Sequence, residues 1–205
     1  TDELQLLPGS RRFQDVATLA TATNGEFATL HGHLTRGTPS FDFVLIDCPP
    51  SLGLLTLNAL SAVDEVILPL QPHFLALHGL SKLLETIELV AERLNEHVRL
   101  SGVLYSLYDS GTRLALEVSR DVDEFFSRPC AASCPWAGAR ALRTRIRRNI
   151  RLAEAPSFGQ SIFQYAPHSN GAEDYRHLAR EVLRLPWAKS TGATSIASPP
   201  GIHAA

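Results

Sequence analysis

One aspartate in this sequence stands where a folded chain of its pattern would bind a ligand. Residues 43–46 form a short, continuous apolar run, which is typical of a strand buried on both faces. Asp47 ends the run, and Pro49 and Pro50 prevent the strand from continuing. A carboxylate at the carboxyl end of a buried strand lies at the edge where open α/β folds bind ligands. The alternative is an aspartate that only caps the following turn.

A second group of chemically useful residues is a cluster of arginines. Six of the twelve residues from 140 to 151 are arginine, and no acidic residue lies between them: Arg140, Arg143, Arg145, Arg147, Arg148 and Arg151. On a strand, Arg143, Arg145 and Arg147 would lie on one face. Such a row repels itself unless it meets an anion, and phosphate matches the guanidinium group well. The alternative is a solvated or salt-bridged edge strand.

Alternating strand and helix patterns must position these residues. The predicted strands lie at 4–9, 43–46, 66–70 and 101–108, and the predicted helices at 11–22, 27–34, 53–62, 77–94, 118–126 and 175–183. Asp109, Ser110 or Thr112 can cap the helix that carries Val118, Val122, Phe125 and Phe126. This alternation predicts an α/β fold with a mainly parallel sheet flanked by helices.

Composition excludes several classes of protein. The chain has 205 residues and a net charge of −2, so any nucleic-acid site must be a local patch. No apolar run approaches the ~18 residues of a membrane span, so we expect a cytoplasmic protein. Three cysteines are too few for a disulfide framework, and Cys130 and Cys134 are interpreted as reduced thiols in a loop.

Three ordered strings resemble one protein family. Residues 47–60, Asp-Cys-Pro-Pro-Ser-Leu-Gly-Leu-Leu-Thr-Leu-Asn-Ala-Leu, are similar to the Walker B strand end and following loop of ParA/Soj-type partition ATPases. These proteins belong to the MinD/ParA superfamily of deviant Walker P-loop NTPases. Residues 64–72 resemble the family's next strand, and residues 148–159 with 171–175 resemble its C-terminal segment. Ordered matches are more specific than one short motif.

The resemblance implies a P-loop NTPase-like, doubly wound domain over residues 1–187, equivalent to the C-terminal two thirds of the family domain. Residues 127–139 are interpreted as a surface insertion, because the family runs more directly from helix to strand there. Residues 188–205 are rich in Ser, Thr, Ala and Pro and are expected to be disordered.

The resemblance also implies site residues. Asp47 would be the catalytic Walker B carboxylate, which orients a water bound to Mg²⁺ next to ATP. Pro49 and Pro50 would belong to a switch loop that senses the γ-phosphate, and Gln71 would lie near the nucleotide. Family members dimerise on ATP and are released from DNA when a ParB-type partner stimulates hydrolysis.

The resemblance also implies a DNA-binding site. ParA proteins bind nucleoid DNA without sequence specificity, through basic residues of their C-terminal region. Arg148 and Arg151 match the family pattern Arg-Asn-x-Arg and are the leading DNA-contact candidates, followed by Arg147, Arg145 and Arg113. The family usually has proline, packed near the adenine, where this chain has Arg147. Such binding would be driven by phosphate contacts and would depend steeply on salt.

The family's phosphate-binding string Lys-Gly-Gly-x-Gly-Lys-Thr does not occur in this sequence, whose first lysine is Lys82. We therefore expect the chain alone neither to bind nor to hydrolyse ATP appreciably. The strand that carries this loop in the family lies beside Walker B, so its absence would expose strand edges. A chain that starts at Thr1 and contains no methionine is interpreted as an internal piece or a processed form.

Two alternatives stay open. The first is a non-enzymatic remnant without a P-loop that binds DNA or a partner. The second is a membrane-associated division regulator of the same superfamily. Residues 188–205 have neither the apolar stripe nor the basic face of a membrane-binding helix, so we expect no membrane partner.

Overall fold

A three-stranded parallel sheet is the centre of the protein. The computed structural model describes residues 4–6, 29–35, 41–49, 53–131 and 133–186. The strands are β1 (Glu65–Leu70), β2 (Arg99–Tyr108) and β3 (Arg140–Arg147), and they lie in the order β1-β2-β3. Both pairings are parallel, so the carboxyl ends of the three strands meet at one edge of the sheet.

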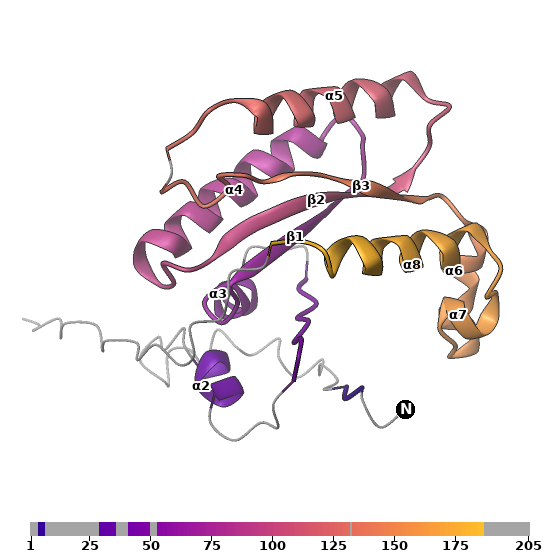
Figure 1. Cartoon of the computed structure of the whole chain (residues 1–205), viewed down its shortest axis with the longest axis horizontal. Helices are drawn as coiled ribbons and strands as arrows, with labels where there is room; N and C mark the ends of the chain where they lie inside the picture. Colours follow the sequence, from indigo (N-terminus) through magenta and orange to yellow (C-terminus); the bar gives the residue numbers. More distant parts are fainter. Residues whose placement is uncertain (1–3, 7–28, 36–40, 50–52, 132, 187–205) are drawn as a thin grey trace, which may run out of the picture.

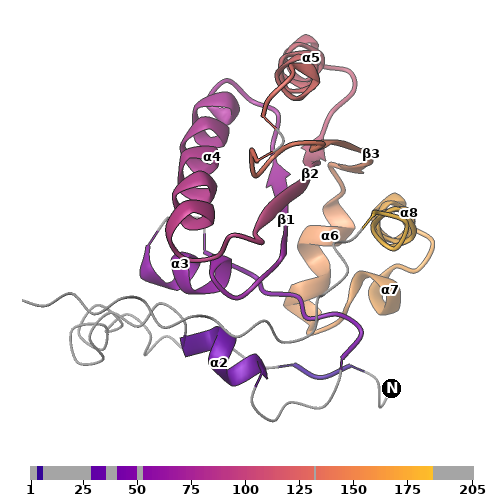
Figure 2. The same cartoon turned by 60° about the vertical axis from the view of Figure 1, so that its left-hand side comes forward.

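Helices cover both faces of this sheet. Helices α4 (Ala76–Arg93) and α5 (Arg113–Ser127) connect successive strands and lie on one face, whereas α8 (Asn170–Val182) lies on the other, against β3 (Figures 1 and 2). The remaining described helices are short: α2 (Thr29–Thr35), α3 (Leu54–Leu60), α6 (Ile150–Glu154), the 3-10 helix η2 (Ala155–Phe158) and α7 (Ile162–Tyr165). This arrangement confirms the predicted α/β class with a parallel sheet flanked by helices.

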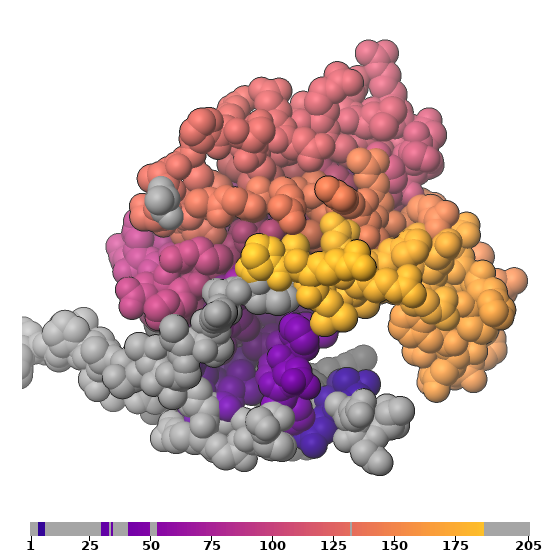
Figure 3. All heavy atoms as spheres, viewed as in Figure 1, coloured from indigo at the N-terminus to yellow at the C-terminus, as the bar shows by residue number. Residues whose placement is uncertain are grey.

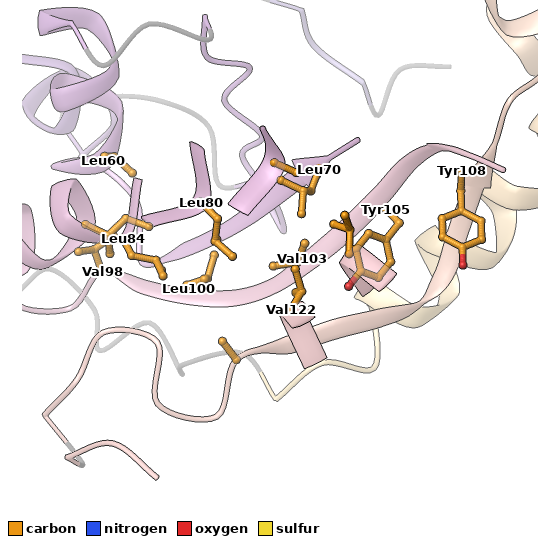
Figure 4. Packing of buried hydrophobic residues seen from close by; sticks show 14 of the residues in the cluster. Leu60, Leu70, Leu80, Leu84, Val98, Leu100, Val103, Tyr105, Tyr108 and Val122 are labelled. Carbon is orange, nitrogen blue, oxygen red and sulfur yellow. The ribbon is translucent and has the colours of Figure 1, made fainter. Parts of the chain in front are cut away.

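The main core lies between the sheet and α4 and α5. Helix α4 buries Leu80, Leu84, Ile87 and Val90, at the spacing that places residues on one helical face. These side chains pack against apolar residues of β2 and α5, including Val103, Tyr105 and Val122 (Figure 4). Truncation of a fully buried member such as Ile87 to alanine costs about 2–5 kcal/mol, because it leaves a cavity.

Local sequence explains where the helices begin. The Thr112 hydroxyl caps α5 by accepting a hydrogen bond from the Ala115 backbone N–H at 3.4 Å, so Thr112 is the cap among the three predicted alternatives. Ser169 caps α8 in the same way through the Ala172 backbone N–H at 3.2 Å. Of the helices and strands predicted from the sequence, those at 53–62, 66–70, 77–94, 101–108, 118–126 and 175–183 are confirmed as α3, β1, α4, β2, α5 and α8.

The predicted buried strand at 43–46 is wrong. Residues 41–49 are not part of the sheet, and Phe43, Val44 and Leu45 are exposed, Leu45 to 90% (Figure 1). The physical reason is a missing neighbour: an apolar run can be buried on both faces only between other elements, and among the described residues no strand pairs with the outer edge of β1. The exposed apolar run and the open β1 edge agree with the expectation of exposed strand edges.

Other predictions fall partly outside the described residues. Residues 4–6 form no strand, and Leu4 and Leu6 are exposed. Helix α2 corresponds to the helix predicted at 27–34, whereas the helix predicted at 11–22 and the tail at 188–205 lie outside the described part of the chain. The proposed insertion at 127–139 contacts the core, because Trp136 packs against it and the Pro135 carbonyl accepts a hydrogen bond from Leu100 at 2.8 Å.

Candidate functional site

A cleft opens at the carboxyl edge of the sheet. It has a volume of about 250 Å³ and is lined by residues that follow all three strands: Gln71, Pro72, Leu107, Asp109, Thr112, Leu114, Ala115 and Arg148. Gln71 comes directly after β1 and Arg148 directly after β3, so the fold brings together two residues that the sequence places far apart. Open parallel sheets bind ligands at this edge.

The turn between β2 and α5 shapes one wall of this cleft. Asp109 accepts a hydrogen bond from the Gly111 backbone N–H at 3.0 Å, and the Thr112 hydroxyl donates to the Asp109 carbonyl at 2.9 Å. Leu107 has φ of 49°, a left-handed conformation that costs a leucine on the order of 1–3 kcal/mol. This strain is located where the chain turns into the cleft.

Asp47 does not contribute to the cleft. Its side chain is exposed, it lies in the extended segment outside the sheet, and neither it nor Pro49 lines the cleft. Pro50 lies outside the described residues. Within the described ranges, no group of three or more His, Cys, Asp or Glu side chains could hold a metal ion. The described residues therefore do not fit a complete site for ATP and Mg²⁺: the cleft has no glycine-rich phosphate-binding loop, Asp47 does not line it, and Asp109, the one carboxylate among its described lining residues, accepts the Gly111 backbone N–H.

Arg147 forms an ion pair with helix α8. Its guanidinium group donates two hydrogen bonds to the Asp174 carboxylate, from Nη2 at 2.6 Å and from Nε at 3.0 Å, and a weaker one to Glu173 at 3.2 Å. Asp174 is buried, with 5% of its surface exposed. Hydrogen bonding to Asp174 raises the pKa of Arg147 further, so this group is charged at every accessible pH. Arg147 thus ties the end of β3 to α8.

Arg145 also has internal partners. Its guanidinium carbon lies 4.4 Å from the centroid of the Tyr108 ring and 5.6 Å from that of Tyr105, and Nη1 donates to the Tyr108 hydroxyl. The Tyr105 hydroxyl donates to the Ser119 carbonyl at 3.2 Å. Burial, and secondarily the negative charge of Asp123, raises the pKa of Tyr105 to about 12, so the hydroxyl remains protonated. The arginines of β3 are therefore divided among different partners rather than forming one free row.

The other three predicted arginines are more accessible. Arg151 pairs with Glu154 at 2.9 Å and Arg113 with Glu117 at 2.8 Å, but both guanidinium groups remain more than half exposed. Surface pairs of this kind are worth at most about 1 kcal/mol, so a phosphate could replace the carboxylate. Arg148 forms no ion pair with any residue that the structure describes, and its side chain borders the cleft.

Carboxylates of α8 cap the outer edge of β3. The two oxygens of Glu181 accept hydrogen bonds from the backbone N–H groups of Arg143 and Thr144 at 2.7 and 2.8 Å. Asp174 accepts from the backbone N–H of Arg147 at 3.0 Å. Burial acts to raise the pKa of Glu181, but the hydrogen bonds from Thr144 and Arg143 outweigh it and lower the pKa. Unpaired edge amides are thus satisfied without another strand.

Sequence reasoning missed Asp174 and Glu181. A signal was nevertheless present, since only four acidic residues occur between 140 and 186, against nine arginines. All four accept hydrogen bonds from arginine side chains or from the β3 backbone: Glu154, Glu173, Asp174 and Glu181. A dense arginine strand followed by few acids predicts that these acids will be its partners.

None of the helices within the described residues is long and apolar enough to cross a bilayer.

Comparisons with known proteins agree with this fold. A family model described as an AAA domain matches residues 1–100. The sporulation initiation inhibitor protein Soj of Bacillus subtilis (strain 168) is 45% identical over 143 residues, which are 70% of this chain and 52% of that protein. The chromosome partitioning protein ParA of Myxococcus xanthus (strain DK1622) is 41% identical over 150 residues, 73% of this chain and 49% of that protein.

A solved structure is similar as well. The crystal structure of cobyrinic acid a,c-diamide synthase from Mycobacterium smegmatis, with bound ATP analog and magnesium, is 33% identical with a TM-score of 0.68. The match covers 87% of this chain and 62% of that one. The chain spans about half the length of the curated relatives it matches. In sequence and in its P-loop NTPase-like fold, the chain is therefore similar to the ParA/Soj partition ATPases of the MinD/ParA family.

Proposed function

We propose that this chain is the part of a ParA-type partition ATPase that contains Walker B and the DNA-binding region, and that the complete protein acts in chromosome or plasmid segregation. The observation that carries this proposal is the meeting of Gln71 and Arg148 at one cleft on the carboxyl edge of the sheet. These residues come from two of the strings that resemble the family, 64–72 and 148–159. The relatives named Soj and ParA support the same function.

In the complete protein, Asp47 is the Walker B carboxylate, and Pro49 and Pro50 belong to the adjoining switch loop. The 205-residue chain does not hold this arrangement, because Asp47 lies in a segment outside the sheet and does not line the cleft. A strand placed beside the open edge of β1 would pair with β1 and cover the apolar side chains of Phe43, Val44 and Leu45. We therefore propose that ATP and Mg²⁺ bind only when such a strand, with its glycine-rich loop, is present.

Non-specific DNA is the proposed macromolecular ligand of the chain itself. Arg148 and Arg151 are the principal contacts, and Arg113 is a weaker one at the first turn of α5. Arg145 and Arg147 bind partners within the protein and hold the strand that precedes Arg148 in place. A ParB-type partner, an ATP-dependent homodimer, and a cytoplasmic location on the nucleoid without membrane contact belong to the same proposal.

One experiment separates this proposal from the non-enzymatic remnant. The affinity for a fluorescein-labelled random-sequence duplex is measured by anisotropy, with and without ATP and Mg²⁺, for the 205-residue chain and for a version preceded by the family's glycine-rich loop and first strand. We expect the chain alone to bind DNA without any effect of ATP, and the extended version to respond to ATP. An extended version that folds but whose DNA affinity does not respond to ATP would favour the non-enzymatic remnant. Such a remnant is physically reasonable, because the arginine surface does not depend on Asp47.

A further inference from the structure

The acidic and the basic side chains of helix α8 have different surroundings. Its acidic side chains Glu173, Asp174 and Glu181 all point to β3, where they pair with Arg147 or accept backbone N–H groups. Its arginines, Arg176 and Arg180, are exposed, and Arg184 follows in the turn after the helix. Asp174 and Glu181 are therefore engaged with β3, and Glu173, although 57% exposed, pairs with Arg147 of β3, so Arg176, Arg180 and Arg184 have no carboxylate partner among the described residues.

The three arginines form a row. They are spaced four residues apart, so neighbours lie about 6 Å apart along one side of the helix. Arg180 and Arg184 form no ion pair with any described residue. Arg176 donates to the Pro167 carbonyl at 2.8 Å and lies over the Phe163 ring, contacts that hold the side chain without neutralising it.

This row continues the proposed DNA surface. Contacts of Arg147 with Asp174 and of Arg143 with Glu181 show that α8 runs antiparallel to β3. The start of α8 therefore lies beside the end of β3, where Arg148 and Arg151 follow. Figure 3 shows α8 (yellow) and the region of α6 and α7 (orange) as one continuous surface on the viewed side of the molecule.

We propose that Arg176, Arg180 and Arg184 are a second row of contacts to the phosphate backbone of duplex DNA, which extends the surface of Arg148 and Arg151 along α8. The inference rests on the proposed DNA binding. Seven of the nine arginines between 140 and 186 have no ion pair within the described structure, and this excess matches a polyanion without sequence readout. An anionic membrane is the competing ligand for such a row.

The test compares two triple variants of the 205-residue chain with equal loss of charge. The first is Arg176→Gln, Arg180→Gln, Arg184→Gln. The matched control is Lys82→Gln, Arg93→Gln, Arg120→Gln, whose exposed side chains lie on α4 and α5 across the sheet. Affinity for a labelled random duplex is measured between about 50 and 200 mM salt. Circular dichroism and an Arg→Lys version of the α8 triple variant report on folding and on charge.

Each phosphate contact contributes about 0.9 to the slope of log K against log salt. We therefore expect the α8 triple variant to lower the slope by about 2–3, so that the ratio of affinities at the two salt concentrations falls by roughly fortyfold. The control and the Arg→Lys version keep the slope of the unsubstituted chain. An unchanged slope in the α8 variant, or an equal change in the control, overturns the inference.

Two further measurements distinguish a failure of the α8 contacts from a failure of the proposed DNA binding by Arg148 and Arg151. If Arg148→Ala with Arg151→Ala removes DNA binding but the α8 variant does not, the α8 inference fails alone. If only the α8 variant weakens binding, the motif arginines of the proposed function fail instead. Vesicles of phosphatidylserine and of phosphatidylcholine test the competing ligand, and binding of the α8 row to the anionic vesicles in place of DNA overturns the inference.

Discussion

The guanidinium group of Arg147 and the buried carboxylate of Asp174 lie 2.6 Å apart at their closest atoms and join the end of β3 to α8. The same carboxylate accepts the backbone N–H of Arg147, so one side chain satisfies both the charge and the backbone of its partner. The pair therefore fixes the end of β3 against α8 through both a side-chain charge and a backbone hydrogen bond.

Breaking this pair should destabilise the fold. We expect Asp174→Asn to lower the free energy of unfolding by about 2–3 kcal/mol, less than for a fully buried pair, because Arg147 is 46% exposed and can turn to water. Urea unfolding measures the change, with Asp121→Asn on exposed α5 as the control. Combined replacement of Arg147 by Met and Asp174 by Leu should cost less than the sum of the single changes, and strict additivity would refute the coupling.

Stability should also fall in acid through Glu181. The pKa of this group in the folded state lies below its ordinary value of 4.5, so its contribution is complete above that value and is lost as the pH falls through the folded-state pKa. Glu181→Gln should remove this part of the acid dependence while lowering stability near neutral pH. Urea unfolding at a series of pH values from neutral down to about 3 tests the sign. A variant with the same acid dependence as the unsubstituted chain would exclude Glu181 as its source.

Replacing the motif arginines should weaken DNA binding uniformly. We expect Arg148→Ala and Arg151→Ala each to reduce the slope of log K against log salt by about 1, with equal effects on unrelated duplex sequences. Fluorescence anisotropy over a salt series provides the measurement, and Arg128→Ala at the C-cap of α5 is a control. An effect confined to one sequence would mean that base contacts, not phosphate contacts, are involved.

Nucleotide binding should require more than these 205 residues. We expect no heat of ATP binding in calorimetry of the chain alone, because no glycine-rich loop is present and Asp47 lies outside the cleft. In a version with the family's first strand and loop added, Asp47→Ala should abolish hydrolysis and leave the circular dichroism spectrum unchanged. Turnover that survives this substitution would remove Asp47 from the catalytic site.

The strain at Leu107 can be measured by a pair of substitutions. Both Leu107→Gly and Leu107→Ala remove the half-exposed side chain, but only glycine adopts φ of 49° at little steric cost. The glycine variant should therefore be more stable than the alanine variant by about 1 kcal/mol in urea unfolding. If alanine were the more stable, the left-handed conformation would not persist in solution.

Local patterns predicted most of the framework. Helix α4 has an apolar residue at nearly every turn, and β1 and β2 are rich in apolar residues, so their type follows from local pattern. The positions of Gln71 and Arg148 also follow, because parallel strands share one carboxyl edge. These features depend only on neighbours that lie close in the sequence or on the direction of the strands.

The segment at 43–46 and the Arg147–Asp174 pair could not be predicted in this way. Whether an apolar run is buried depends on a neighbouring strand, and the residues of the run do not reveal whether that strand is present. The partner of Arg147 lies 27 residues away on another helix, and three acids of α8 were equally possible from the sequence. In both cases the outcome depends on long-range packing rather than on local preference.

The carboxylates along β3 have a consequence for how the sheet can grow. With Glu181 and Asp174 holding the outward amides of β3, a newcomer strand finds hydrogen-bonding groups available at β1 but not at the opposite border. Within the described structure, an added strand, from the same protein or from another chain, would therefore pair beside β1 and not beside β3.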